Sequence, residues 1–330
     1  MSEPTVSRVL NGRLGVSDRT RDQVVAALED LGFTDVPTPA RTRPGVVGVV
    51  CGNFENPIFP ALLSAVSAAF GRHGKLVTVA VADAELNPEE RCIDEFRRTG
   101  VDAVVFVGGR HAQVDGSYER YHELTEAGVP IVLVNGAATE LAVPHVRCDE
   151  EAAAHRATAH LLGLGHHVVG CIVGSSAYVP TQRIIAGHRR ACADVGVPVD
   201  PDAIAETSFT FEGARAAALR LIERDITAIF AANDLMALGA IEAGRSRGRG
   251  TPDLLSVVGY DGTDFSAFTD PPLTTLRQPI EDMADLAAAA VQAELTGSTL
   301  YRDHYVFEAD LLSRASTAPA SGALAHGPDE

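Results

Sequence analysis

Short continuous apolar runs alternate with amphipathic stretches along most of the chain. Apolar runs of this kind predict buried strands, and apolar positions three or four residues apart predict helices between them. From residue 46 onward the pattern predicts strand and helix in turn over residues 46–50, 57–72, 76–81, 88–98, 101–107, 118–127 and 131–134. Continuously apolar strands separated by helices are typical of a parallel sheet covered on both faces.

The same alternation starts again in the second half of the chain. Strand and helix patterns recur over residues 168–173, 181–195, 203–207, 211–224, 227–231, 235–245 and 255–260. The repeat is one of architecture rather than of sequence, and it predicts an α/β protein with two doubly wound parallel-sheet lobes. Ligands of such sheets bind beyond the carboxyl ends of the strands, so two facing lobes predict one binding cleft between them.

Residues 1–45 follow a different pattern. Ser17 is placed as the N-cap of a helix that Gly32 closes, with Val24 and Leu28 on one face. Residues 33–45 are repeatedly interrupted by proline and read as a linker. A small all-α segment and a linker are therefore expected before the two lobes.

Residues 1–12 predict a short helix with an exposed polar face. Ser2 is placed as its N-cap with Pro4 in the first turn, and Val6, Val9 and Leu10 share the opposite side. Short hydroxyl, amide and arginine side chains suit phosphate oxygens and base edges in the major groove of DNA, although a solvated surface helix would show the same pattern. The candidate DNA contacts are Glu3, Pro4, Thr5, Ser7, Arg8 and Asn11.

Composition limits where nucleic acid can bind. The formal net charge of −17 argues against a protein that coats nucleic acid along its length, so any DNA contact has to be local and reinforced by dimerisation. No apolar run is long enough to span a membrane and the start lacks a signal segment, which predicts a cytoplasmic location. The cysteines are scattered without a C-x-x-C pair, so reduced, buried thiols are expected rather than a disulfide or a metal site.

Signals for an enzyme, a metal or a cofactor are weak. His166 and His167 are adjacent, and on a strand they would point to opposite faces. No G-x-G-x-x-G follows a predicted strand, and no nucleophile elbow or paired carboxylates are found. We therefore expect no catalytic residues, no metal and no cofactor.

The first predicted strand is followed by side chains suited to a small polar ligand. Asn53 comes just beyond the strand end, and Ile58 and Phe59 begin the next helix. An aromatic ring can lie flat against a sugar or a base, and an amide can bridge neighbouring hydroxyls. A purely structural role for Phe59 in the core is the alternative.

Several segments resemble the LacI/GalR family of bacterial transcription regulators. The resemblance covers almost all of the chain and rests on Thr-Val-Ser-Arg-Val-Leu-Asn-Gly at residues 5–12 and on motifs at residues 46–59, 164–166, 232–239, 258–261, 272–279 and 316–319. It implies a DNA-reading head and a sensor domain similar to periplasmic sugar-binding proteins, whose chain crosses between lobes three times. We expect these crossings near residues 147–151, 277–280 and 301–305.

The resemblance also implies effector-binding positions in the second lobe. Asn233 and Asp261 match family positions that hydrogen-bond effector hydroxyls or ring nitrogens, although helix capping would also explain them. Phe209 resembles the stacking aromatic of this lobe. The family's effector-binding arginine falls at Ile184, so Arg183, one residue earlier, is the candidate, and Gln182 is the second choice.

The resemblance also shows where this chain departs from the family pattern. The family's hinge helix has an Ala-Arg-Ser-Leu-like core, of which only Ala40 and Arg41 are present, and prolines disfavour a helix there. The family also has a complete first helix before the point where this chain starts. We expect Met1 to be a start assigned at an internal valine codon, with about twenty residues upstream that complete the helix-turn-helix.

These observations predict a cytoplasmic homodimer that binds operator DNA under the control of a small polar effector, a sugar or sugar derivative. A stand-alone small-molecule-binding protein that has lost DNA binding is the alternative. The expected domains are a truncated helix-turn-helix head over residues 1–32, a linker over 33–45, a sensor over 46–315 and a disordered tail over 316–330. Within the sensor, residues 46–148 and 280–301 form the N-lobe, and residues 149–278 and 304–315 form the C-lobe.

Overall fold

The computed structural model describes Val24, Ala27 and residues 45–52, 54–82, 87–136, 140–298, 301 and 303–320. Val24 and Ala27 lie in a helix, and the chain divides into two compact units, residues 1–45 and 46–330. The candidate DNA contacts Glu3, Pro4, Thr5, Ser7, Arg8 and Asn11 and the expected hinge all lie outside the described residues. These expectations therefore stay predictions.

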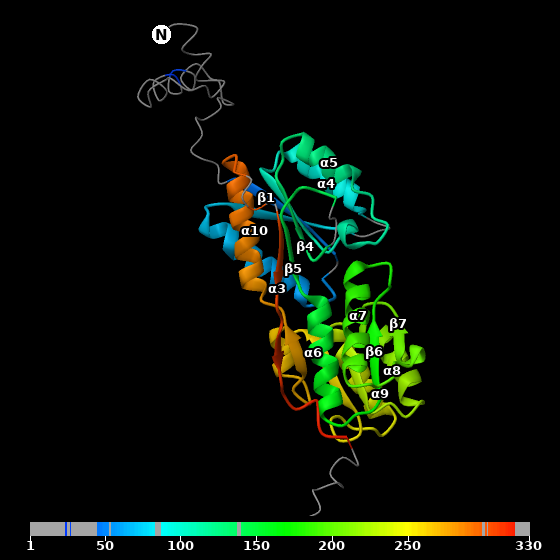
Figure 1. Cartoon of the computed structure of the whole chain (residues 1–330). Coiled ribbons are helices and arrows are strands. Elements are labelled where there is room, and N and C mark those ends of the chain that lie inside the picture. Colours follow the sequence, from blue (N-terminus) through cyan, green and yellow to red (C-terminus); the bar gives the residue numbers. More distant parts are fainter. Residues whose placement is uncertain are drawn as a thin grey trace, which may run out of the picture. The chain divides into compact units, whose positions relative to one another are not determined.

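The N-lobe is built on a six-stranded parallel sheet in the order β11-β5-β4-β3-β1-β2 (Figure 1). Helices α3 and α10 cover one face, and α4 and α5 cover the other. The bounds are β1 Val46–Cys51, α3 Ile58–Arg72, β2 Leu76–Val81, α4 Glu89–Thr99, β3 Ala103–Val107, α5 Glu119–Glu126, β4 Ile131–Val134, β5 His145–Cys148, α10 Ile280–Leu295 and β11 His304–Phe307.

Burial of both sheet faces explains the unbroken apolar runs. In β3, Ala103, Val105 and Val107 pack under α3 and α10, whereas Val104 and Phe106 pack under α4 and α5. Successive side chains of a strand point to opposite faces, so a strand covered on both sides needs apolar residues at every position.

The C-lobe has a second six-stranded sheet in the order β12-β10-β9-β8-β6-β7, in which only β12 runs antiparallel among the described pairings. Its helices pack in two pairs, α6 with α7 and α8 with α9. The bounds are α6 Glu150–Gly163, β6 Val169–Val173, α7 Val179–Asp194, β7 Ile204–Glu206, α8 Phe211–Ile222, β8 Ala228–Ala231, α9 Asp234–Ser246, β9 Ser256–Asp261, β10 Thr274–Arg277 and β12 Asp310–Leu312. The prediction of two parallel-sheet α/β lobes is confirmed.

Some elements were not predicted from the hydrophobic pattern. Helices α6 and α10 are rich in alanine, so their buried faces are made mostly of Ala side chains, which leave a weak apolar stripe. Strands β5, β10, β11 and β12 have at most four residues each and contain polar residues. Such elements form because partners in the sheet complete their hydrogen bonds, which the local pattern does not reveal.

The chain passes between the lobes three times, and one crossing differs from the expectation. Crossings occur between β5 and α6 and between β10 and α10, where they were expected. The third lies between Phe307 and Asp310 instead of within residues 301–305, because β11 extends the N-lobe sheet with His304 opposite His145. Residues 304–307 therefore belong to the N-lobe.

The expectation of a disordered tail from Ser316 is wrong for residues 316–320. The Ser316 side chain is buried, donating to the carbonyl of Val257 at 2.6 Å and accepting from the amide of Thr274 at 2.8 Å. His166 lies before β6 rather than on a strand, and its ring is 3.1 Å from the carbonyl of Ala318. These contacts hold residues 316–318 against the C-lobe.

Within the described ranges, no helix has both the length and the apolar character needed to cross a membrane.

Candidate functional site

A cavity of about 570 Å³ lies between the two lobes, beyond the carboxyl ends of strands from both sheets. In each lobe, residues at the end of three strands or one or two positions beyond it line the cavity, as expected for the doubly wound arrangement. These are Gly52, Gly108 and Asn135 after β1, β3 and β4, and Ser175, Asn233 and Asp261 after or at the end of β6, β8 and β9.

One wall of the cavity is apolar and comes from the N-lobe. Ile58 and Phe59, at the start of α3, both line it. The Phe59 ring packs against Gly52 and Gly108, and a Cβ at either glycine would lie about 3.5 Å from the ring. Phe59 therefore both packs against its own lobe and presents a ring to the cavity, so the two interpretations of this residue are compatible.

A second aromatic surface faces the cavity from the C-lobe. Phe209 is 40% exposed and covers Gly174 so closely that a Cβ on that glycine would lie 1.9 Å from the ring. Its ring meets that of Tyr178 edge to face, with centroids 6.1 Å apart. Both aromatics line the cavity, which gives flat apolar surfaces on which a ring-shaped ligand can stack.

Asp261 connects both lobes through hydrogen bonds. Its Oδ2 accepts from Nδ2 of Asn56 at 3.1 Å, and its Oδ1 accepts from Nε2 of Gln278 at 2.8 Å. Asn56 cannot be flipped without loss, because its Oδ1 accepts from the amide of Ile58. Burial raises the pKa of Asp261 well above its ordinary value, while the two amide donors oppose that rise. The backbone φ of +105° at Asp261 is one that L residues rarely adopt, a sign of strain at this site.

The two polar atoms of the Asn233 side chain differ in their hydrogen bonding. Its Oδ1 caps helix α9 by accepting from the amide of Met236 at 2.7 Å. Its Nδ2 is buried and has no hydrogen-bond partner among the residues that the structure describes. The neighbouring Asp234 does not line the cavity. It accepts from the Thr263 backbone and hydroxyl and from the Thr275 hydroxyl, and burial raises its pKa to about 6.

Four buried polar atoms around the cavity lack partners among the described residues: Asn135 Oδ1, Thr181 Oγ1, Asn233 Nδ2 and Gln278 Oε1. Each unpaired buried atom costs about 1–3 kcal/mol, so a cluster of them indicates a site for a polar ligand. Asn135, Thr181 and Gln278, and also Asn56, were not among the contacts predicted from the sequence. Asn135 directly follows β4, so the strand-end argument that selected Asn53 could also have selected it.

The expected arginine contact is arranged differently. Arg183 does not line the cavity, because its guanidinium is 3.2 Å from Oε2 of Glu150, which does line it. Ile184 lines the cavity, and Gln182 is exposed with its amide bonded to the carbonyl of Ser176. Asn53 lies outside the described residues. Of the seven predicted effector contacts, the cavity therefore brings together Ile58, Phe59, Phe209, Asn233 and Asp261.

Two family models match the chain. One, described as "Bacterial regulatory proteins, lacI family", matches residues 1–35. The other, described as "Periplasmic binding protein-like domain", matches residues 158–317. The first of these matches favours a regulator over a binding protein without a DNA-reading head.

Curated relatives and solved structures agree with these matches. The HTH-type transcriptional regulator MalR of Streptomyces coelicolor is 40% identical over 327 residues, covering 98% of this chain and 95% of MalR. DegA of Bacillus subtilis, also an HTH-type transcriptional regulator, is 30% identical over 97% of this chain and 95% of its own length. The structure of the transcriptional regulator CelR–cellobiose complex superposes with a TM-score of 0.75 at 30% identity, covering 96% of each chain. The chain therefore belongs to the LacI family of bacterial transcription regulators and is not an enzyme.

Proposed function

We propose that this regulator responds to a sugar or sugar derivative bound in the cavity between its lobes, and that the bound ligand controls its binding to operator DNA in the cytoplasm. The observation that carries the proposal is the ring of unpaired polar atoms around Asp261, set between the aromatic surfaces of Phe59 and Phe209. Sugars present hydroxyls around their edge and apolar C–H faces above and below, which suits this combination. The related CelR, whose solved structure is a complex with cellobiose, supports the same class of ligand.

The ligand would act by changing the balance between lobe positions. Asn56 and Asn135 come from the N-lobe, whereas Asn233 and Thr181 come from the C-lobe, so one ligand touches both. Its binding free energy then depends on how the lobes are placed. A ligand shifts such an equilibrium only by its difference in affinity for the two arrangements.

We further propose a homodimer formed through the sensor domain. Strand β2 is the last strand of its sheet, and its Leu76 and Val79 are 57% and 42% exposed. An edge strand with exposed apolar residues suits pairing with a second copy. A two-fold dimer also matches the symmetry of a palindromic operator. Sedimentation velocity at micromolar concentration should show a dimer, and a monomer there would contradict this part of the proposal.

Calorimetry with a panel of neutral sugars and nucleosides tests the effector. We expect at least one sugar to bind one site per chain. DNA duplexes selected from a random pool by the protein would then be used in fluorescence anisotropy with and without that sugar. The sugar should change the affinity for the selected DNA. If no compound of the panel gives a heat of binding, the proposed function is contradicted. An affinity for DNA that the sugar leaves unchanged would contradict it as well.

A further inference from the structure

Glu150 stands between the cavity and two positive side chains. It is the first residue of α6, its carboxylate is buried and it lines the cavity. Its Oε2 accepts from Nη1 of Arg147 and from Nη1 of Arg183, each at 3.2 Å. Neither arginine lines the cavity. The carboxylate thus meets the ligand space, and both guanidiniums are held behind it.

Among the described residues, the charged side chains that line the cavity are all acidic. Among the described residues that line the cavity, there is no lysine, arginine or histidine, while Glu55, Glu150 and Asp261 are acidic. A bound anion would lie against these carboxylates without a cation to pair with it. Bringing like charges together in a partly buried site opposes binding.

The positive end of helix α6 does not offset this. A helix N-terminus attracts anions through its free backbone amides. Here the side chain of Asp149 already caps α6 by accepting from the amide of Ala152 at 3.1 Å. Glu150 and Glu151 add two acidic residues to the first turn. The helix end is therefore already occupied by carboxylates of the chain itself.

The unpaired atoms lead to the same conclusion by a different route. Of the four unpaired atoms, Asn135 Oδ1 and Gln278 Oε1 can only accept a hydrogen bond, Asn233 Nδ2 can only donate one, and Thr181 Oγ1 can accept or donate. The Gln278 amide is oriented by its Nε2, which donates to the carboxylate of Asp261. A hydroxyl can donate to these acceptors. A phosphate dianion or a carboxylate has no proton to donate and would leave them unpaired.

We propose that Glu150 restricts the cavity to uncharged, hydroxyl-rich ligands by withholding Arg147 and Arg183 from it, so that phosphorylated and acidic sugars are excluded. This inference rests on the proposed function, since it specifies which sugars the site accepts. Glu150 is in this sense a specificity-determining residue.

Calorimetry with matched pairs tests the inference: glucose against glucose 6-phosphate and glucuronate, ribose against ribose 5-phosphate, and maltose against maltose 6′-phosphate. We consider each pair whose neutral sugar binds the unmodified protein. The anionic sugar of that pair should bind at least ~100-fold more weakly than its neutral partner. E150Q should bind that anionic member at least ~10-fold more tightly than the unmodified protein does, because the two guanidiniums have lost their carboxylate.

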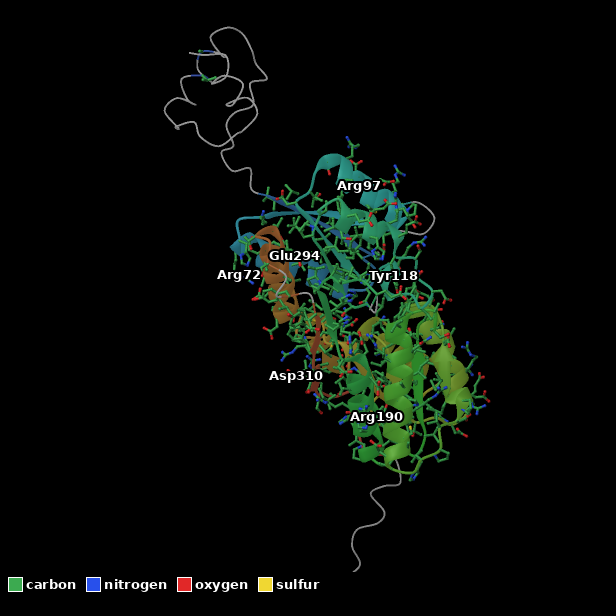
Figure 2. The ribbon with its side chains drawn as sticks, turned by 45° about the horizontal axis from the view of Figure 1, so that its top comes forward. Arg72, Arg97, Tyr118, Arg190, Glu294 and Asp310 are labelled. Atoms are coloured by element: carbon green, nitrogen blue, oxygen red, sulfur yellow. The ribbon has the colours of Figure 1, made fainter. Side chains whose placement is uncertain are left out.

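Glu151→Gln is the matched control. It makes the same charge change one residue later on α6, but Glu151 pairs with Arg190, which is 51% exposed and labelled in Figure 2, and it does not line the cavity. E151Q should keep the discrimination of the unmodified protein. Circular dichroism checks that both variants are folded.

The outcomes separate this inference from the proposed function. An anionic sugar bound as tightly as its neutral partner by the unmodified protein would overturn the exclusion and leave a sugar sensor in place. Equal behaviour of folded E150Q and E151Q would remove Glu150 from the explanation. If no sugar of either kind binds, the proposed function itself fails. The comparison within the unmodified protein needs no variant, so it decides the exclusion even if E150Q does not fold.

Discussion

Asp261→Asn should weaken effector binding at least ~100-fold while the protein stays folded. The carboxylate accepts Nδ2 of Asn56 and Nε2 of Gln278 on its two oxygens. An asparagine of the same shape would place an NH₂ group against one of those donors and would lose an acceptor for ligand hydroxyls. A buried polar group without a partner costs about 1–3 kcal/mol, and more when a charge is involved. Calorimetry with the sugar found in the panel measures the loss.

Asp264→Asn provides the control for this variant. Asp264 lies three residues further along, is exposed and does not line the cavity, so the same change there should leave the affinity unaltered. Melting temperatures of both variants should stay within a few degrees of the unmodified protein. An undiminished affinity in D261N would remove Asp261 from the effector site.

The same carboxylate should make effector binding depend on pH. Burial raises the pKa of Asp261 well above its ordinary value, so acidification protonates it sooner than an exposed carboxylate. Ligand hydroxyls that donate to the carboxylate favour its charged form. The dissociation constant should therefore rise as the pH falls toward that raised pKa, and D261N should lack this dependence.

Gly187→Ala should destabilise the sensor domain by about 3 kcal/mol or more. A Cβ at Gly187 would lie 2.0 Å from the carbonyl oxygen of Glu151 and 3.0 Å from Cβ of Ala154, so α7 would have to move away from α6. Backbone atoms of a packed helix cannot yield as a flexible side chain can. Because α7 also carries Thr181 and Ile184 into the cavity, effector affinity should fall as well. Urea unfolding measures the first effect and calorimetry the second.

Gly163→Ala separates this packing effect from the loss of glycine itself. Gly163 is the last residue of α6, and nothing lies within 4 Å of a Cβ built there. Alanine favours a helix over glycine by up to about 1 kcal/mol, so this variant should be as stable as the unmodified protein or slightly more stable. A destabilisation equal to that of G187A would contradict the proposed packing role of Gly187.

Much of the fold could be predicted from the sequence because strand and helix periodicity is a local property. Val104 and Val105 are both apolar since each faces a different buried layer, and this is visible without knowing what forms those layers. The position of the cavity followed from the rule that ligands of parallel sheets bind beyond the carboxyl strand ends. That rule, together with the family motifs, led to Asn233 and Asp261.

Other features depended on contacts between distant segments. Ser316 is ordered because Val257 and Thr274 form a place for its hydroxyl, and no local pattern distinguishes it from the other small polar residues near the end of the chain. The third crossing lies later than expected because β11 pairs with β5, which is a property of sheet order. The alanine-rich helices α6 and α10 became recognisable only through the surfaces on which they pack.

The arrangement around Glu150 shows the difference most directly. The sequence, through the family resemblance, placed a crossing between the lobes near residues 147–151 and Arg183 beside the expected effector contact. Only the tertiary structure decided that Arg147 and Arg183, from different lobes, converge on one carboxylate oxygen, and that no described residue lining the cavity is positively charged. The spacing of apolar residues along a strand or helix follows from local backbone geometry and is therefore visible in the sequence. Which acidic and basic side chains form ion pairs depends instead on the distances between segments in the folded protein.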